Sequence, residues 1–278
     1  MIISVSRRCD IPRFKFDWFM ERINEMFVDT VNPYNAAQTK RIPLVPMKDA
    51  MINEKGVDAF VFWTRDPKHI LANTDELNRR GFPFYVMVSV TGYPGALEPN
   101  QAPVNEVISS IKELSAKIGS DRVIWRYDPV FLTSITDENF HYQNFLSLAK
   151  NFCGHVKRVI ISFYDEYKTA KKRLLKLEQE GKIKIYDSNS GDYYKIASDF
   201  VKIAKNFNIE IQTCAEKENF ASLGLKPGAC IDAALIKNIC TAQTARDKNQ
   251  RPDCLCCKSV DIGVYGTCAA RCVYCYAW

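Results

Sequence analysis

Hydrophobic and polar residues follow one another along the chain in a pattern that predicts strands alternating with helices. Short runs of β-branched and aromatic residues are typical of buried strands, and between them lie amphipathic segments of helical period such as DWFMERINEMF and DYYKIASDFVKIAKNF. The expected strands are residues 3–6, 27–32, 59–64, 84–91, 122–127, 156–163, 209–214 and 260–265. Eight such strands with helices between them predict an α/β fold, a (β/α)8 TIM-type barrel.

One segment departs from this alternation. After the second expected strand, NPYNAAQTKRIPLVP (32–46) contains an Asn/Pro turn and predicts a local antiparallel hairpin. No internal repeat, low-complexity tract or Gly-, Ser- or Pro-rich linker divides the chain. We therefore predict a single domain over residues 1–278, with a cysteine-rich segment at 214–278 and a loop and helix at 217–258 between the last two strands.

Composition favours an ordinary globular protein of the cytoplasm. Of the 278 residues, 47% are hydrophobic and 25% are charged. No window approaches the ~20 uninterrupted apolar residues of a membrane span, and MIISVSRRCD does not fit a signal peptide. The net charge of +6 is spread over stretches such as KTAKKRLLKLEQEGKIK (168–184), which are typical of a solvated helix face rather than of a nucleic-acid stripe.

The eleven cysteines fit metal ligands better than disulfides, since the cytosol keeps thiols reduced. Cys9 and Cys153 are isolated, and the others fall in the last quarter of the chain. The closing TCAARCVYCYAW spaces Cys268, Cys272 and Cys275 as C-x3-C-x2-C, so that a single loop can turn three thiolates toward one cubane cluster and leave one iron open. The alternative is zinc, which needs a fourth ligand and more usually pairs two C-x2-C or C-x2-H knuckles.

Polar residues follow the expected strands, and in a barrel such residues gather at one mouth. Each of them alone also fits a loop start or a helix cap. Our candidates for catalysis at this mouth are Arg7, Arg8, Asp10, Arg126 and Asp128, and our candidates for cofactor binding are Ser6, Trp63, Thr64 and Tyr274. The aromatic residues Tyr34, Trp63, Tyr93, Tyr127 and Tyr164 suit a planar or apolar substrate, and they equally suit packing under the loops.

CAARCVYCYA, with Tyr274 directly before its third cysteine, resembles the cluster loop of the radical S-adenosylmethionine enzymes. The resemblance implies a 4Fe-4S cluster on Cys268, Cys272 and Cys275 whose open iron binds S-adenosylmethionine. One electron then cleaves this cofactor to a 5'-deoxyadenosyl radical, which abstracts hydrogen from a substrate. In most of that superfamily the loop follows the first strand of the barrel, whereas here it follows the last expected strand.

A circularly permuted barrel would reconcile the two positions, because the first and last strands of a closed barrel are neighbours. Residues 260–265 would then match the usual first strand, and residues 3–6 the second. The resemblance places Ser6, Arg7 and Arg8 where relatives contact the methionine part of the cofactor, with arginine suited to a carboxylate. Cluster ligation would hold the chain terminus in place.

Over the whole chain, ISVSRRCDIPRF, FVFWTRDP, IWRYDPVFLT, TCAEKENFASLGLKPGACID and SVDIGVYGTCAARCVYCYA resemble the domain-of-unknown-function family 1848. The family's cysteine pattern carries over to the three terminal cysteines and to Cys214, Cys230, Cys254 and Cys256. Four further thiols are the number that a second, auxiliary 4Fe-4S cluster needs, and the alternative for Cys214 and Cys230 is that they are buried thiols.

The sequence departs from this family at two cysteines. The family usually has threonine where Cys9 stands and a residue other than cysteine where Cys257 stands, so both are interpreted as incidental, although Cys257 could compete with Cys256 as a ligand. Cys153 and Cys240 are expected in the core.

Three functions follow as hypotheses. The first is a radical S-adenosylmethionine enzyme that receives electrons from a donor such as flavodoxin or ferredoxin and acts on an unknown small-molecule or nucleic-acid substrate. The second is a non-catalytic iron-sulfur or zinc protein. The third is a DNA-repair-type lyase, favoured by the slight basic excess and by the similarity of CVYCYA to the cluster loop of spore photoproduct lyase and other repair members. His69, His141 and His155 are not in metal-ligand spacing with a carboxylate.

Overall fold

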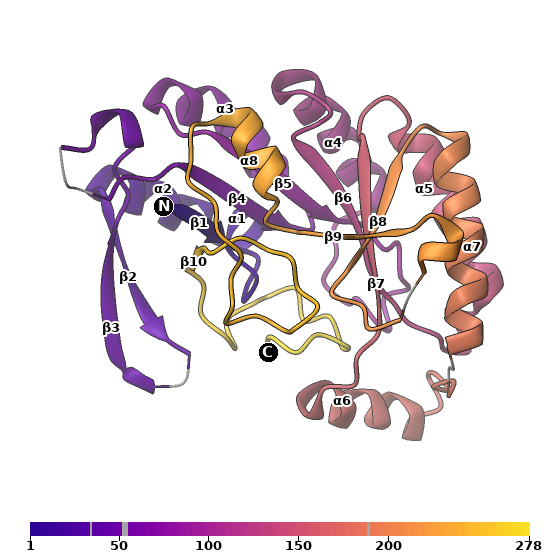
Figure 1. Cartoon of the computed structure of the whole chain (residues 1–278). Coiled ribbons are helices and arrows are strands. Elements are labelled where there is room, and N and C mark those ends of the chain that lie inside the picture. The colour runs from indigo at the N-terminus through magenta and orange to yellow at the C-terminus, as the bar shows by residue number, and fades with distance from the viewer. Residues whose placement is uncertain (34, 52–54, 188–189, 219) are drawn as a thin grey trace.

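The computed structural model describes residues 1–33, 35–51, 55–187, 190–218 and 220–278, and its centre is a parallel sheet (Figure 1). The strand order is β10-β1-β4-β5-β6-β7-β8-β9, and every neighbouring pair is parallel. In chain order these strands are β1 (Ile2–Val5), β4 (Ala59–Thr64), β5 (Phe84–Ser89), β6 (Val123–Val130), β7 (Arg158–Phe163), β8 (Glu210–Cys214), β9 (Lys226–Gly228) and β10 (Val260–Asp261).

The expected parallel α/β architecture is confirmed, and closure into a barrel is not detected. Within the described ranges, pairing runs from β10 at one edge to β9 at the other, and no pairing joins these two strands. The predicted contact between the two ends of the chain is present, because Ile3 pairs with Val260 and Ser4 with Asp261.

The prediction that residues 27–32 belong to the main sheet is wrong. They form β2 (Phe27–Asn32), which pairs with β3 (Asn35–Pro43) as the predicted antiparallel hairpin. Val28 is the buried residue of β2, so this strand offers too little apolar surface for a central position. The eighth place in the sheet belongs to β9, whose sequence KPG carries no strand signal. Tyr34, one of the candidate aromatic residues, lies outside the described residues.

The helices of the described residues include the amphipathic segments predicted from the sequence, with small shifts of their ends. They are α1 (Ile11–Phe14), α2 (Phe16–Glu25), α3 (Lys68–Arg80), α4 (Val104–Ile118), α5 (Glu138–Phe152), α6 (Lys168–Gln179), α7 (Ser190–Asn206) and α8 (Ala233–Ile239), with 3-10 turns at Met47–Asp49 and Ala221–Leu223. Asp137 and Asp232 cap α5 and α8 by accepting hydrogen bonds from free backbone N–H groups. None of the described helices has the length and hydropathy required to span a bilayer.

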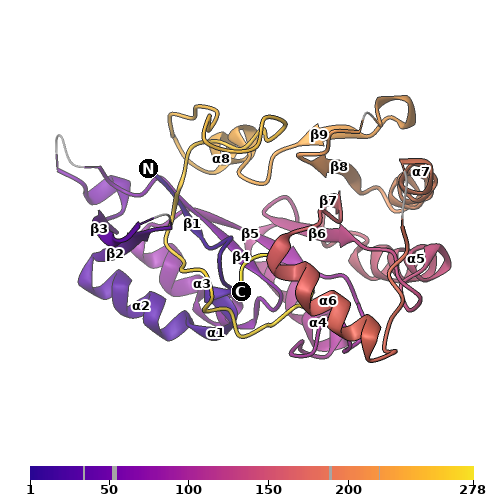
Figure 2. The ribbon, with the colours of Figure 1, turned by 90° about the horizontal axis from the view of Figure 1, so that it is seen from below.

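Alternation along the strands gives the sheet two different faces. Phe60, Phe62 and Phe84 belong to the larger core, which the helices α2 to α5 and α7 cover. Val61 and Tyr85 face the other way, into a second core with α8 and several cysteines. In Figure 2, α2 and α3 lie on one side of the strands, and α8 with the segment after it lies on the other.

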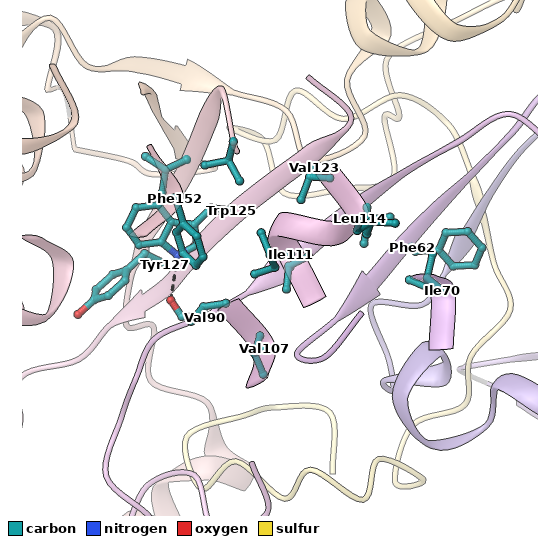
Figure 3. Close-up of a cluster of buried hydrophobic side chains, with 14 of the residues drawn as sticks. Phe62, Ile70, Val90, Val107, Ile111, Leu114, Val123, Trp125, Tyr127 and Phe152 are labelled. Carbon is teal, nitrogen blue, oxygen red and sulfur yellow. Dashed lines mark hydrogen bonds between the residues drawn. The ribbon is translucent and has the colours of Figure 1, made fainter. Parts of the chain in front are cut away.

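The buried half of β6 determines where its polar residues point. Trp125 and Tyr127 are fully buried in the larger core, and the indole N–H of Trp125 donates to the carbonyl oxygen of Val90 at 2.9 Å (Figure 3). Successive strand residues point to opposite faces, so Arg126 lies on the α8 face of the sheet. The packing of two aromatic residues thus aims an arginine at the site described next.

Candidate functional site

A cavity of about 590 Å³ opens at the carboxyl ends of β1, β4, β6, β7 and β8. Each of the residues that we proposed from the sequence for catalysis, cofactor binding or metal ligation lines it. They are Ser6, Arg7, Arg8, Asp10, Trp63, Thr64, Arg126, Asp128, Tyr274 and the cysteines Cys214, Cys230, Cys254, Cys256, Cys268, Cys272 and Cys275. The structure therefore brings segments from both ends of the sequence to one place, together with the ends of several strands between them.

Four of these thiols, from Cys214, Cys230, Cys254 and Cys256, touch one another and are called the four-thiol group. The Sγ atoms of Cys214 and Cys230 are 3.3 Å apart. Cys230 and Cys254 both donate hydrogen bonds to Cys256, which lowers the pKa of the Cys256 thiol and raises that of Cys254. The pKa of Cys230 is raised first by its hydrogen bond with Cys214 and then by the one with Cys256. The amide of Ile231 donates to the Cys256 sulfur at 3.3 Å. Residues from three separate segments of the chain thus surround Cys256, whose lowered pKa favours the thiolate.

Two arginines add positive charge beside the four-thiol group. The guanidinium carbons of Arg7 and Arg126 lie 5.9 and 4.9 Å from the ring centroid of Trp63. After the hydrogen bonds between thiols, the charge of Arg126 further lowers the pKa of Cys214, and that of Arg7 lowers the pKa of Cys256. Trp63 Nε1 and Arg126 Nε are buried without a hydrogen-bond partner among the described residues. Buried N–H donors are nearly always hydrogen-bonded, and an anionic, sulfur-rich group could accept from these two.

The loop of residues 267–278, called the terminal loop, is fixed to the segment between β5 and α4. The side-chain amide of Asn100 donates to the carbonyl oxygen of Ala269 at 2.9 Å, and the amide of Val273 donates to the carbonyl oxygen of Leu97 at 2.9 Å. Gln101 Nε2 donates to Cys272 Sγ at 3.3 Å. These contacts hold the loop through its backbone and through one cysteine sulfur.

Arg173 of α6 holds the other side of the terminal loop. Its guanidinium donates to the carbonyl oxygens of Val273 at 3.0 Å and Trp278 at 2.7 Å, and also to that of Cys275. It also lies 4.2 Å from the ring centroid of Trp278. The lysines of the 168–184 stretch are exposed as predicted, whereas Arg173 is half-buried. An arginine of α6 thus holds the terminal loop through three of its carbonyl oxygens.

A buried charged network lies behind the motif tyrosine. Arg65 NH2 donates to Glu98 Oε1 at 2.5 Å and to the hydroxyl oxygen of Tyr274 at 2.6 Å, and Tyr274 in turn donates to Glu98. Thr91 Oγ1 donates to the same carboxylate oxygen at 2.5 Å. Burial raises the pKa of Cys272 to about 12, and the charge of Arg65 opposes this rise. The hydroxyl of Tyr274 is therefore committed to protein partners, while its ring lines the cavity.

Asp261 organises the residues after β1. Its carboxylate accepts hydrogen bonds from Ser4 at 2.8 Å, Ser6 at 2.5 Å and the backbone of Arg7 at 2.8 Å, and it also lies 3.9 Å from Arg8 Nε. A Cβ at Gly263 would come within 2.0 Å of Ser6 Oγ, so only glycine fits this close approach. The sequence did not single out Asp261, because its partners lie at the far end of the chain.

Asp10 and Thr64 make contacts typical of local structural roles. Asp10 caps α1 by accepting from Arg13 N at 3.0 Å, and it accepts from Arg65 N at 2.8 Å. Thr64 Oγ1 donates to the carbonyl oxygen of Asp66 at 2.9 Å. Burial raises the pKa of Asp10 to about 6. These are the helix-cap contacts that the sequence left open as an alternative.

Several expectations about individual side chains need correction or refinement. Cys153 is exposed rather than in the core, because α5 ends at Phe152. Cys240 is half-buried and donates to the carbonyl oxygen of Ile236. Of the candidate aromatic residues, Tyr127 points into the larger core, and Tyr93 is buried with its hydroxyl donating to Pro129, whereas Tyr164 lines the cavity.

The seven candidate cysteines have the number and chemistry of cluster ligands. Within the described ranges, no group of three or more His, Cys, Asp or Glu side chains is arranged to hold a metal ion.

These features define a parallel α/β protein with eight cysteines around one cavity, namely Cys9 and the seven candidate ligands. Residues 2–277 match the model of the family described as "Domain of unknown function (DUF1848)", and the chain belongs to this family. No curated protein matches the sequence. A solved structure titled "Spore photoproduct lyase complexed with dinucleoside spore photoproduct" aligns with 56% of this chain and 50% of that chain, at a TM-score of 0.38 and 10% identity. The match spans about half of that chain, and a TM-score this low carries no argument about function.

Proposed function

We propose that this chain is a radical S-adenosylmethionine enzyme built on a permuted (β/α)8-type sheet. Cys268, Cys272 and Cys275 would ligate the catalytic 4Fe-4S cluster, and the four-thiol group would ligate an auxiliary cluster. The observation that carries the proposal is that all seven cysteines line one cavity together with the arginines and aspartates of the strand ends.

The terminal loop suits a cluster with one open iron. It provides three thiols, and three ligands leave the fourth iron free for the amino and carboxylate groups of S-adenosylmethionine. Cys272 has an N–H donor from Gln101 and a neighbouring cation in Arg65, and both favour its thiolate form. A zinc site would need a fourth ligand close to these three. Cys9 is the nearby thiol that could serve, because its neighbours include Cys268 as well as Val264 and Thr267.

The four-thiol group suits a fully ligated cluster. Four thiolates around such a cluster leave a net negative charge, which Arg7 and Arg126 offset and to which the indole N–H of Trp63 could donate. Because no iron would be left open, this cluster would relay electrons rather than bind substrate. Arg7 therefore serves the auxiliary site in this proposal, not the methionine carboxylate.

When bound, the catalytic cluster and S-adenosylmethionine together supply a 5'-deoxyadenosyl radical for hydrogen abstraction. Arg8 suits the cofactor carboxylate, since it lines the cavity and its guanidinium is held beside Tyr265 at 5.3 Å and Gly263 O at 3.3 Å. Asp128, which pairs with Arg126 and accepts from Ser162, faces the same cavity and is assigned to the substrate side. An electron donor such as flavodoxin or ferredoxin is required, because the cleavage consumes one electron.

The test is reconstitution under anaerobic conditions, followed by metal analysis and by dithionite reduction with S-adenosylmethionine. We expect about seven to eight irons per chain and formation of 5'-deoxyadenosine. Cys272→Ala should abolish 5'-deoxyadenosine, whereas Cys240→Ala should retain it, because Cys240 lies outside the cavity wall. Zinc in place of iron, or iron without cleavage, would favour a non-catalytic metal protein instead.

A further inference from the structure

The hydrogen bond from Gln101 to Cys272 joins two distant parts of the chain at a proposed cluster ligand. Gln101 Nε2 lies 3.3 Å from Cys272 Sγ, 171 residues away in sequence. Cys272 is only 7% exposed, so this contact is largely buried. We propose that Gln101 is a positioning residue that donates an N–H···S hydrogen bond to the Cys272 thiolate and thereby raises the reduction potential of the catalytic cluster. This inference rests on the proposed function.

The orientation of the Gln101 amide is fixed by Arg13. Arg13 NH1 donates to Gln101 Oε1 at 3.0 Å. A guanidinium has only donors, so the amide oxygen must face Arg13, and the NH2 group must face Cys272. Arg13 is itself held at the start of the chain, because its backbone N–H donates to the helix cap Asp10. The donor on the sulfur is therefore set by a second side chain and not by chance rotation.

The physical effect follows from the charge on the sulfur. Reduction adds negative charge to a cluster, part of which resides on its cysteine sulfurs, and a hydrogen bond to such a sulfur stabilises the reduced form more than the oxidised form. The bond from Gln101 is shielded, and Arg65 adds positive charge near the same cysteine. Cys275 Sγ differs, because it accepts from the backbone N–H of Ala277 in the same loop, at 3.4 Å. Gln101 is thus a side chain whose replacement should change the reduction potential of the catalytic cluster.

Variants of two neighbouring residues distinguish an effect on the reduction potential from a loss of contacts that hold the terminal loop. Gln101→Leu removes the donor to the sulfur, and Asn100→Leu removes a donor to the carbonyl oxygen of Ala269 in the same loop. The readout is the midpoint potential from a redox titration followed by electron paramagnetic resonance, using the signal that changes when S-adenosylmethionine is added. Gln101→Leu should shift this potential to more negative values, and Asn100→Leu should leave it at the wild-type value.

Two further variants distinguish a change of the reduction potential from a failure of the chain to bind the cluster. Gln101→Glu keeps the shape of the side chain but replaces the donor with a carboxylate, so it should shift the potential in the same direction. Arg13→Met releases the amide and should also lower the potential, and in the double variant with Gln101→Leu the two shifts should be less than additive. Equal potentials for loaded wild type, Gln101→Leu and Gln101→Glu would overturn the inference alone. A wild-type chain that loads no cluster responding to S-adenosylmethionine would overturn the proposed function, and this inference with it.

Discussion

The carboxylate of Asp261 lies 2.8 Å from the backbone nitrogen of Arg7, although 254 residues separate them. This contact fastens the end of β1 to β10, the two strands from opposite ends of the chain. It also fixes the backbone direction from which Arg7 and Arg8 enter the cavity. The candidate site is therefore assembled by contacts between residues that lie far apart in the sequence.

Asp261→Ala should destabilise the fold strongly. The carboxylate is 5% exposed and accepts from two serine hydroxyls and two backbone amides, which would all lose their partner. We expect a loss of about 3–5 kcal/mol in the free energy of unfolding, measured by anaerobic denaturant titration. Asp253→Ala, at an exposed aspartate of the cysteine segment, should cost less than about 0.5 kcal/mol. Similar small values for both would show that Asp261 is not the organising residue of this junction.

Arg173→Leu should loosen the terminal loop without unfolding the protein. It removes donors to the carbonyl oxygens of Val273, Cys275 and Trp278. Losing charge-assisted bonds worth about 1.5–3 kcal/mol should increase hydrogen exchange in residues 268–278 by about tenfold or more in the apo chain. Lys172→Leu, one residue away and exposed, is the control and should leave that exchange unchanged. Unchanged exchange in Arg173→Leu would mean that other contacts hold the loop.

The sequence predicted which residues line the cavity better than it predicted which residues hold them in place. Period-two strands place alternate residues on one face and strand ends at one edge, so Arg126 and Asp128 could be assigned to the cavity together with the cysteines. Glu98, Gln101 and Arg173 were missed, because nothing in the local sequence tells a solvated polar residue from one that reaches a loop more than a hundred residues away. Strand β9 was also missed from the sequence. Its residues KPG have a weak strand propensity, and pairing with β8, which the local sequence does not reveal, outweighs it.

Cys256→Ala and Cys257→Ala should differ sharply although the two residues are adjacent. Cys256 accepts hydrogen bonds from two other thiols, whereas Cys257 has Thr244 and Lys237 among its neighbours and does not line the cavity. We expect Cys256→Ala to lose about four irons per chain and Cys257→Ala to retain the wild-type content. The reverse result would identify Cys257 as the ligand.

Cys9→Thr tests in the same way whether Cys9, the thiol near the terminal loop, is a metal ligand. Cys9 is buried and lines the cavity close to Thr267, so it is the candidate that could complete a four-cysteine site. If the three terminal cysteines act without it, Cys9→Thr should retain both iron content and 5'-deoxyadenosine formation. A loss of about four irons would instead indicate a closed site, and the open iron of the proposed function would have to be abandoned.

Asp10→Asn should change how stability depends on pH. Burial raises the pKa of Asp10 from 3.8 to about 6, so the folded chain prefers the protonated acid. The contribution of this group to stability is fully present below the unfolded pKa and is lost as the pH rises through about 6. The full effect is about 3 kcal/mol, and about 1.4 kcal/mol of it falls between pH 5 and pH 8. Across that interval, wild type should lose about this much free energy of unfolding relative to Asp10→Asn, on top of a constant cost for the lost acceptor to Arg65.

Asp29→Asn is the control for this measurement. The hydrogen bond from Arg41 lowers the pKa of exposed Asp29, so its contribution to stability is lost only as the pH falls below the usual range of a carboxyl. The difference between wild type and Asp29→Asn should therefore be flat from pH 5 to pH 8 in anaerobic denaturant titrations. A flat difference for Asp10→Asn as well would mean that Asp10 is ionised throughout this range. Its carboxylate, at the cavity wall beside Arg65, would then carry a full negative charge and return to the set of residues that could act on substrate.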